Sequence, residues 1–164
     1  MSPEGEARVR TGIGYDCHRF VAGRALVLGG VEFDHPLGLE GHSDADVLTH
    51  AIIDALLGAA ALEDIGHHFP DSDERYRDAN SIDLLRATAA MLTERGIGVE
   101  HVDATVVIER PAIAPLRDKL RARLAEAIGL TVAQVSVKAT RGEGLGFVGR
   151  EEGAAALAVA TVRL

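Results

Sequence analysis

The chain has 164 residues, of which 47% are hydrophobic and 26% are charged, proportions that are typical of a globular protein and exclude a disordered or fibrous one. A chain of this length can bury about two thirds of its unfolded surface, so we expect a single domain over 1–164, in which 1–8 form a flexible N-terminal extension. The formal net charge of −8 argues against binding to nucleic acid, because a surface that neutralises phosphates needs clustered Lys and Arg.

Three features of the sequence point to the cytoplasm. The first ten residues contain no apolar core before a small-residue cleavage site. The longest apolar run, 51–62, is interrupted by Asp54 and Gly58 and is too short to span a membrane. Cys17 is the one cysteine, which excludes an intramolecular disulfide and a Cys-rich zinc cluster. We therefore expect a cytoplasmic protein with no membrane partner.

A strand and a hairpin are the first predicted elements. Residues 8–16 alternate as a strand does and lead directly into Asp16, Cys17 and His18. Two short apolar runs, 26–28 and 31–33, flank a Gly-Gly dipeptide, which favours a two-residue hairpin turn.

A helix is predicted to start at Asp44. Ser43 has the side-chain acceptor of an N-cap, and Asp46 stands three residues later, where a capping-box acid would lie. Apolar residues then recur at steps of three and four, while Asp46, His50 and Asp54 follow one another at steps of four. The helix therefore combines an apolar face with a row of His and carboxylate side chains.

The second half of the chain predicts an α+β pattern. Residues 154–164 are rich in Ala, but Val159 and Thr161 favour a strand, which we predict. Strands and helices in this order favour a mixed sheet with helices packed on one face. The remaining predicted elements are an irregular loop at 63–73, a helix capped by Ser81 at 81–95, a strand at 102–108, a helix from Pro115 to Ile128 closed by Gly129, and a strand at 135–140.

Asp16 and His18 are predicted to form part of a metal site. Residues two apart on a strand point to the same face, so their side chains project together while Cys17 turns away. His50 would complete one carboxylate and two imidazoles, the ligand set of a catalytic zinc site with an open fourth position. Asp46 or Asp54 would orient the His50 ring from outside the metal shell.

The glycine-rich segment 138–150 supports two interpretations. Its backbone N–H groups, with Lys138, Arg141 and Arg150, could receive an anion, or the segment could be an ordinary turn with solvated charges. A dinucleotide-binding motif is rejected, because only 15 residues follow Gly149 and that motif needs a helix and an acid about 20 residues on. An EF-hand after Asp71 is excluded, because Tyr76 occupies the position of the required glycine.

Several distinctive motifs follow one another along the chain. They are Gly12-Ile13-Gly14-Tyr15-Asp16-Cys17-His18-Arg19-Phe20, His42-Ser43-Asp44-Ala45-Asp46, His50, Asp54-Ala55-Leu56-Leu57-Gly58-Ala59, Asp64-Ile65-Gly66, Phe69-Pro70-Asp71, and Glu143 to Arg150. Together these motifs resemble the 2-C-methyl-D-erythritol 2,4-cyclodiphosphate synthase family, and the resemblance runs from about Arg10 to the C-terminus in the family's order.

This resemblance implies a lyase of non-mevalonate isoprenoid biosynthesis. Its substrate would be 4-diphosphocytidyl-2-C-methyl-D-erythritol 2-phosphate, whose 2-phosphate attacks the β-phosphorus and releases CMP. The resemblance also implies a homotrimer with active sites between subunits, zinc at Asp16, His18 and His50, and magnesium or manganese on the diphosphate. Such a reaction needs two anionic groups to be aligned and relieved of repulsion, which agrees with the lack of a nucleophilic triad.

The resemblance also assigns the other site residues. His42 would be catalytic and lie at the phosphate, near the positive end of the helix dipole. Arg141 and Ala112 stand where the family usually has Thr and Lys, and we predict that Arg141 supplies the missing cation as a catalytic residue. The substrate-binding residues would be Asp16, His18, His42, Ser43, Asp64, Ile65, Gly66, Phe69, Pro70, Asp71, Ser72, Asp73, Thr140, Arg141, Gly142, Glu143, Phe147 and Arg150, with 108–114 and 140–143 enclosing the CDP part of a neighbouring subunit's site.

Two other functions fit the same residues. A metal-dependent phosphohydrolase would use the Asp-His-His site to activate water. A non-enzymatic trimeric scaffold with structural zinc is disfavoured, because a closed zinc site needs a fourth protein ligand. His67 and His68 are the nearby candidates for a fourth ligand, and we interpret them as solvated loop residues.

Overall fold

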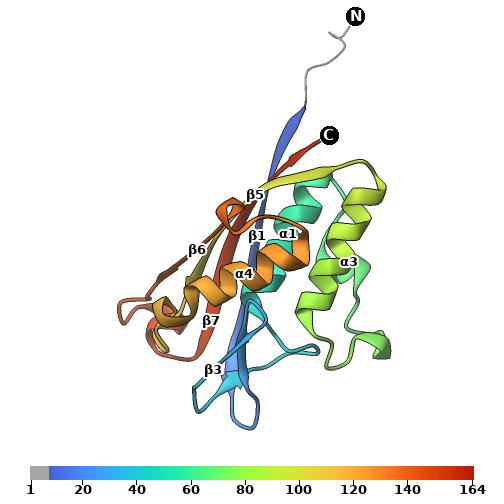
Figure 1. Ribbon diagram of the computed structural model, residues 1–164. Helices are drawn as coiled ribbons and strands as arrows, with labels where there is room; N and C mark the ends of the chain where they lie inside the picture. The colour runs from blue at the N-terminus through green and yellow to red at the C-terminus, as the bar shows by residue number, and fades with distance from the viewer. Residues whose placement is uncertain (1–7) are drawn as a thin grey trace, which may run out of the picture.

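The computed structural model describes residues 8–164, so the predicted extension at 1–8 falls, apart from Arg8, outside the described residues. A five-stranded sheet forms the centre of the fold (Figure 1). Its strand order is β4 (Gly38–Leu39), β1 (Val9–Val21), β7 (Gly153–Arg163), β5 (Gly98–Val107) and β6 (Val135–Thr140), and a separate hairpin pairs β2 (Leu26–Leu28) with β3 (Val31–Phe33).

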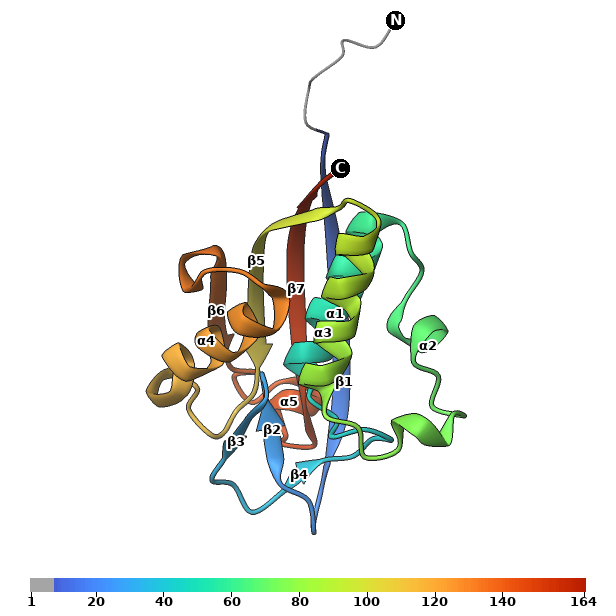
Figure 2. The ribbon, with the colours of Figure 1, turned by 45° about the vertical axis from the view of Figure 1, so that its right-hand side comes forward.

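The sheet is mixed, as predicted. β5 and β6 run parallel, while the other neighbouring strands are antiparallel. The helices α1, α3 and α4 lie on the same side of the sheet (Figure 2). The helical elements are α1 (Val47–Ala60), α2 (Ile65–His68), α3 (Ser81–Glu94), α4 (Arg117–Ile128) and α5 (Gly146–Gly149), with 3₁₀ turns at Glu74–Tyr76, Ala114–Leu116 and Val132–Gln134.

Helix α1 packs directly against β1, because β1 presents glycine to it. A Cβ atom on Gly12 would lie 2.1 Å from the Ala55 carbonyl oxygen, and one on Gly14 would lie 1.8 Å from the Ala51 carbonyl oxygen. No other residue fits at either position. The close approach places His50, on the first turn of α1, beside Asp16 and His18 on the same strand.

The two faces of the sheet differ sharply. On the helix side, alternate residues of β5 and β7, such as Val102, Val106 and Ala156, are fully buried in an aliphatic core. On the other side, large apolar residues are exposed, and Ile13 is 71% accessible. The exposed apolar residues of this bare face are Val9, Ile13 and Tyr15 on β1 and Leu157 and Val159 on β7.

The predicted hairpin and the predicted strands at 135–140 and 154–164 are confirmed within a residue at each end. Gly129 closes α4 as predicted, but the predicted N-cap of α1 is wrong. Helix α1 starts at Val47, and its N-cap is Asp46, which accepts from the Thr49 backbone N–H at 3.0 Å. Ser43 accepts instead from Ala45, whose positive φ of 55° prevents helix there.

Two further predictions need correction. Helix α3 is capped by the Asn80 side chain, so Ser81 is the first helical residue rather than the cap. The predicted irregular loop at 63–73 contains helix α2, because Asp64 accepts from the His67 backbone N–H and starts a helical turn.

Candidate active site

Asp16, His18 and His50 come together at the junction of β1 and α1, and we name them the metal cluster. The Asp16 Oδ2 atom lies 3.0 Å from His18 Nε2 and 3.0 Å from His50 Nδ1. One ligand atom from each residue lies within 4.8 Å of the others. Cys17 is exposed and takes no part, as its position on the strand predicts.

The ionisation of these groups follows from their contacts. Burial favours a raised pKa for Asp16, but the hydrogen bonds from His18 and His50 outweigh it and lower the pKa to about 2. Burial also opposes a charge on His50, but its hydrogen bond with Asp16 outweighs burial and raises the pKa of the imidazole. Asp16 is therefore a carboxylate at neutral pH.

The donor set fits a zinc ion. Ligands that bind tetrahedral zinc at about 2.0 Å lie about 3.3 Å from one another, close to the separations in the metal cluster. Three protein ligands leave a fourth position for another molecule, whereas a structural site is closed. The cluster therefore has the chemistry of a catalytic rather than a structural zinc site.

The predicted orienting residues of His50 are not the ones that the structure supplies. Asp46 accepts from the backbone N–H groups of Gly29 and Gly30 and from Thr49, and so ties α1 to the hairpin. Asp54 accepts from the Ile65 backbone N–H at 2.8 Å. Neither carboxylate forms a side-chain hydrogen bond with the His50 ring.

Two serines contact the His50 ring instead. The Ser81 Oγ atom lies 2.8 Å from His50 Nε2, and the Ser43 Oγ atom lies 3.2 Å from the same nitrogen. Ser81 comes from the first turn of α3, 31 residues along the chain, and no local sequence pattern connects it to His50. Because Ser81 was interpreted as a helix cap, its contact with His50 was not predicted.

A cavity of about 300 Å³ opens beside the metal cluster. Gly41, Tyr76 and Leu84 line it without having been predicted, and neither Tyr76 nor Leu84 belongs to a motif with polar chemistry. Most of the residues predicted between 42 and 73 line this cavity as well, although Asp64, Ser72 and Asp73 do not. The predicted residues that do are His42, Ser43, Ile65, Gly66, Phe69, Pro70 and Asp71, together with the metal cluster itself.

Asp64 and Asp73 form hydrogen bonds with residues close to them in sequence. Asp64 caps α2, and Asp73 accepts from the Arg75 backbone and pairs with its guanidinium. His42 reaches Asp73 through its ring, with Nε2 3.4 Å from the backbone oxygen. The Asp46 carboxylate caps the N-terminus of α1, and the placement of His42 at a phosphate stays a prediction.

A second concave site lies at the other edge of the sheet, and we name it the proline pocket. It is a cavity of about 170 Å³ in which the segment after β5 meets the end of β6. Its lining residues are Ile108, Glu109, Pro111, Ala112, Ile113, Ala114, Arg117, Ala139, Thr140 and Arg141.

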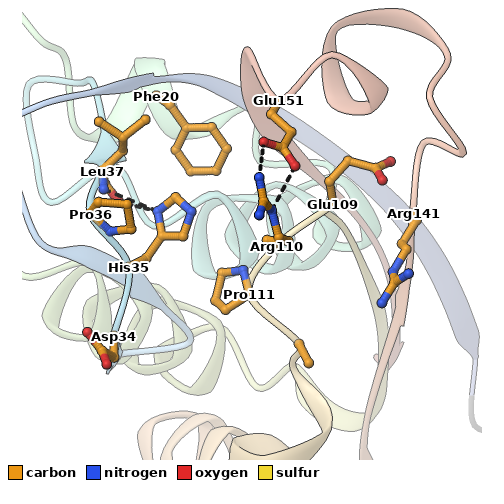
Figure 3. A pocket seen from close by; sticks show the side chains of 11 residues that line it. Phe20, Asp34, His35, Pro36, Leu37, Glu109, Arg110, Pro111, Arg141 and Glu151 are labelled. Atoms are coloured by element: carbon orange, nitrogen blue, oxygen red, sulfur yellow. Dashed lines mark hydrogen bonds and ion pairs between the residues drawn. The ribbon is translucent and has the colours of Figure 1, made fainter.

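A larger cavity of about 530 Å³ adjoins the proline pocket and shares Glu109, Pro111, Ala112 and Arg141 with it (Figure 3). Figure 3 shows Arg110 joined to Glu151, with Arg141 beyond Glu109. Among the residues that the structure describes, no carboxylate lies within ion-pair distance of Arg141. This guanidinium is thus available to an anionic ligand.

The rest of the glycine-rich segment is engaged within the protein. Lys138 pairs with Asp103 at 2.7 Å, and Arg150 pairs with Glu152 at 2.8 Å. The Gly142 backbone N–H donates to Glu109. Arg141 therefore remains the candidate for anion binding from the predicted basic set. Glu143 is outside both cavities, while Phe147 lines a separate hollow that includes Cys17 and His18.

The metal cluster and the proline pocket lie in one row of the sheet. Asp16 pairs with Ala156, Ala156 pairs with Val106, and Val106 pairs with Ala139. Three strand spacings separate the two ends of this row, which amounts to about 14 Å. The two cavities share no lining residue.

No helix among residues 8–164 is long and apolar enough to cross a membrane. The comparisons with known proteins agree with the site. A family model described as YgbB family matches residues 9–163. The "Bifunctional enzyme IspD/IspF" of Anaeromyxobacter dehalogenans is 61% identical over 94% of this chain, which spans 40% of that relative.

Two further proteins match along almost their whole length. The "2-C-methyl-D-erythritol 2,4-cyclodiphosphate synthase" of Alkaliphilus metalliredigens is 54% identical over 94% of this chain and 97% of its own. The solved "IspF (Plasmodium falciparum) CDP complex" superimposes with a TM-score of 0.84 at 28% identity and covers 96% of this chain and 97% of that one. A match to the family model from the first strand to the last, with these relatives, shows that the chain belongs to the YgbB family.

Proposed function

We propose that this chain converts 4-diphosphocytidyl-2-C-methyl-D-erythritol 2-phosphate to 2-C-methyl-D-erythritol 2,4-cyclodiphosphate and CMP. The observation that carries the proposal is the metal cluster, open on one side to a cavity that contains His42 and Ser43. The name of the Alkaliphilus relative supports the reaction. Because the chain spans 40% of the bifunctional relative, the activity of the whole protein is part of the proposal.

The protein's contribution is alignment and charge balance. Asp16, His18 and His50 would hold zinc, which supplies positive charge to the diphosphate, and a magnesium or manganese ion would bind the diphosphate as well. His42 and Ser43 would donate to the phosphate oxygens from the wall of the cavity. An oxygen of the 2-phosphate then bonds to the β-phosphorus, and the bond from that phosphorus to the oxygen shared with the CMP phosphate breaks.

We propose that the active site is completed by a second subunit of a homotrimer. The proline pocket, with Thr140 and Arg141, would bind the CDP part, and the CDP complex of the Plasmodium relative supports a ligand of this class. It lies about 14 Å from the metal cluster of its own chain, beyond two intervening strands. The bare face, with Ile13 and Tyr15 exposed, supports burial against further copies of the chain.

A single domain over 1–164 and a cytoplasmic location complete the proposal. They rest on the length of the chain and on the biosynthetic role that the relatives' names indicate. Neither bears on the chemistry of the metal cluster.

The reaction is tested by incubating the protein with the cytidyl substrate and Zn²⁺ and Mg²⁺ in water enriched in ¹⁸O, with phosphorus NMR as the readout. The proposal predicts CMP and a cyclic diphosphate without ¹⁸O, and no product when a chelator is added. Linear phosphate products that carry ¹⁸O would instead establish the phosphohydrolase.

A further inference from the structure

The contacts of His50 extend beyond the metal cluster into a chain of polar groups. The His50 ring places Nδ1 toward Asp16 and Nε2 toward Ser81. The Ser81 hydroxyl in turn contacts Asp44 Oδ1, and the Ser81 backbone N–H donates to Asp44 Oδ2 at 3.0 Å. Ser81 is fully buried, so water does not substitute for these partners.

The order of protons along this chain follows from the donors available. The Asp44 carboxylate is a pure acceptor, so the single Ser81 proton points to Asp44. A lone pair of the Ser81 oxygen then faces His50 Nε2, and this contact is a hydrogen bond if Nε2 carries the proton. When a metal ion replaces the proton that His50 Nδ1 shares with Asp16, the lone pair of Nδ1 faces the side where Asp16 and His18 place their own ligand atoms.

We infer that Ser81 and Asp44 are positioning residues of the metal site, which fix His50 in the tautomer that protonates Nε2 and presents Nδ1 to the metal. The inference rests on the metal site proposed above and adds two residues that act through His50 alone. Metal-binding histidines are commonly oriented in this way by an acceptor on their second nitrogen. Here that acceptor is a hydroxyl that a carboxylate polarises.

The surroundings make His50 the ligand whose orientation is most constrained. Asp44 is itself held, because its backbone N–H donates to the Ala79 carbonyl and its Oδ1 accepts from the Asp46 backbone N–H. The chain therefore joins α3 to the loop before α1. His18, in contrast, has no hydrogen-bond partner on Nδ1 among the described residues.

Ser43 is a weaker alternative partner. Its oxygen is 3.2 Å from His50 Nε2, against 2.8 Å for Ser81, and it already accepts from the Ala45 backbone N–H at 3.2 Å. The Ser43 oxygen thus acts as an acceptor toward the protein and keeps its proton for the cavity. The two serines have different tasks although both contact one nitrogen.

The decisive measurement is the zinc affinity of Ser81→Ala and of Asp44→Asn, by titration of Zn²⁺ against a chromophoric chelator. Loss of an orienting partner commonly lowers metal affinity about 10- to 100-fold, which we expect for Ser81→Ala. We expect a smaller loss for Asp44→Asn. Since Asp44 acts through Ser81, the double variant should lose no more than about twofold beyond Ser81→Ala alone.

A matched control separates positioning from stability. Thr88→Val removes another buried hydroxyl of α3, one that donates to the Leu84 carbonyl within the helix. It should bind zinc as the unchanged protein does, and thermal melting of the zinc-loaded variants would verify that each is folded. Folded Ser81→Ala protein with unchanged zinc affinity would overturn the inference.

The tautomer is tested by NMR of the zinc-loaded protein with ¹⁵N-labelled histidine. The expected result is a proton on His50 Nε2 and a metal-shifted Nδ1; a proton on Nδ1 would overturn the inference. Failure of the unchanged protein to bind zinc would instead contradict the proposed metal site. The two failures are therefore distinguishable.

Discussion

The metal cluster and the proline pocket are built in opposite ways. In the metal cluster, Asp16 contacts both histidines at 3.0 Å, and His50 is tied to a second helix through Ser81. In the proline pocket, Arg141 extends from the end of β6 with no carboxylate partner among the described residues. Groups that hold a metal ion need to be preorganised, whereas a pocket that, as proposed, a neighbouring chain completes can remain open in the single chain.

The comparison predicts that damage to the metal cluster abolishes the reaction without affecting the proline pocket. His50→Ala removes one of three ligands, so we expect turnover to fall about a thousandfold or more, since the metal contributes several kcal/mol to the transition state. Binding of CDP, measured by calorimetry without metal, should change less than about twofold. Lost CDP binding would mean that the two sites are not independent.

Mixed trimers test whether the two sites belong to different chains. His50→Ala and Arg141→Glu subunits, each inactive alone, should recover about a quarter of the normal activity when mixed at equal amounts, because about one interface in four combines two intact halves. The readout is CMP release after mixing under conditions that allow subunit exchange. No recovery, with mixed trimers verified by mass spectrometry, would show that each chain builds its own site.

Arg141 is the next largest expected effect. Arg141→Ala should lower kcat/KM about 10- to 100-fold, the value of a charge-assisted hydrogen bond to phosphate. Arg86→Ala is a suitable control, since this exposed arginine of α3 pairs with Asp83 and Glu126 away from both cavities. Equal kinetics for the two variants would contradict the proposed role of Arg141.

The smallest effect concerns the stability of the metal-free protein at acid pH. The pKa of Asp16 is about 2 in the folded protein, below its ordinary 3.8, so its contribution is present above pH 3.8 and is lost as the pH falls toward 2. Over this range the free energy of unfolding of the unchanged protein should fall by up to about 2 kcal/mol more than that of Asp16→Asn. Urea unfolding at several pH values gives the difference, and parallel curves for the two proteins would refute it.

Most of the longer elements and the metal cluster could be predicted from local sequence patterns. The alternation of Val102, Ala104 and Val106 reflects one buried face of β5, and the spacing of Asp16 and His18 reflects the two-residue period of a strand. The Gly-Gly turn identified the hairpin. In each case the cause lies within a few residues of the chain.

Two of the errors concern groups whose partners are distant in sequence. Asp46 precedes His50 by four residues and was predicted to orient its ring, but the backbone N–H groups of Gly29 and Gly30 donate to the Asp46 carboxylate. Ser81 was predicted to cap a helix, but Asn80 caps α3 and the Ser81 hydroxyl contacts the His50 ring. In both places the partners that matter for the site come from another element of the fold, which no local pattern reveals.

The sequence by itself determined the longer strands and helices of this protein and the three residues able to bind a metal, because the periods of 2.0 and 3.6 residues and the donor chemistry of His and Asp are local properties. Only the tertiary structure decided which side chains orient His50 and which face of the sheet stays bare. Those features depend on α3 meeting α1 and on three helices covering one side, and no residue carries that information alone.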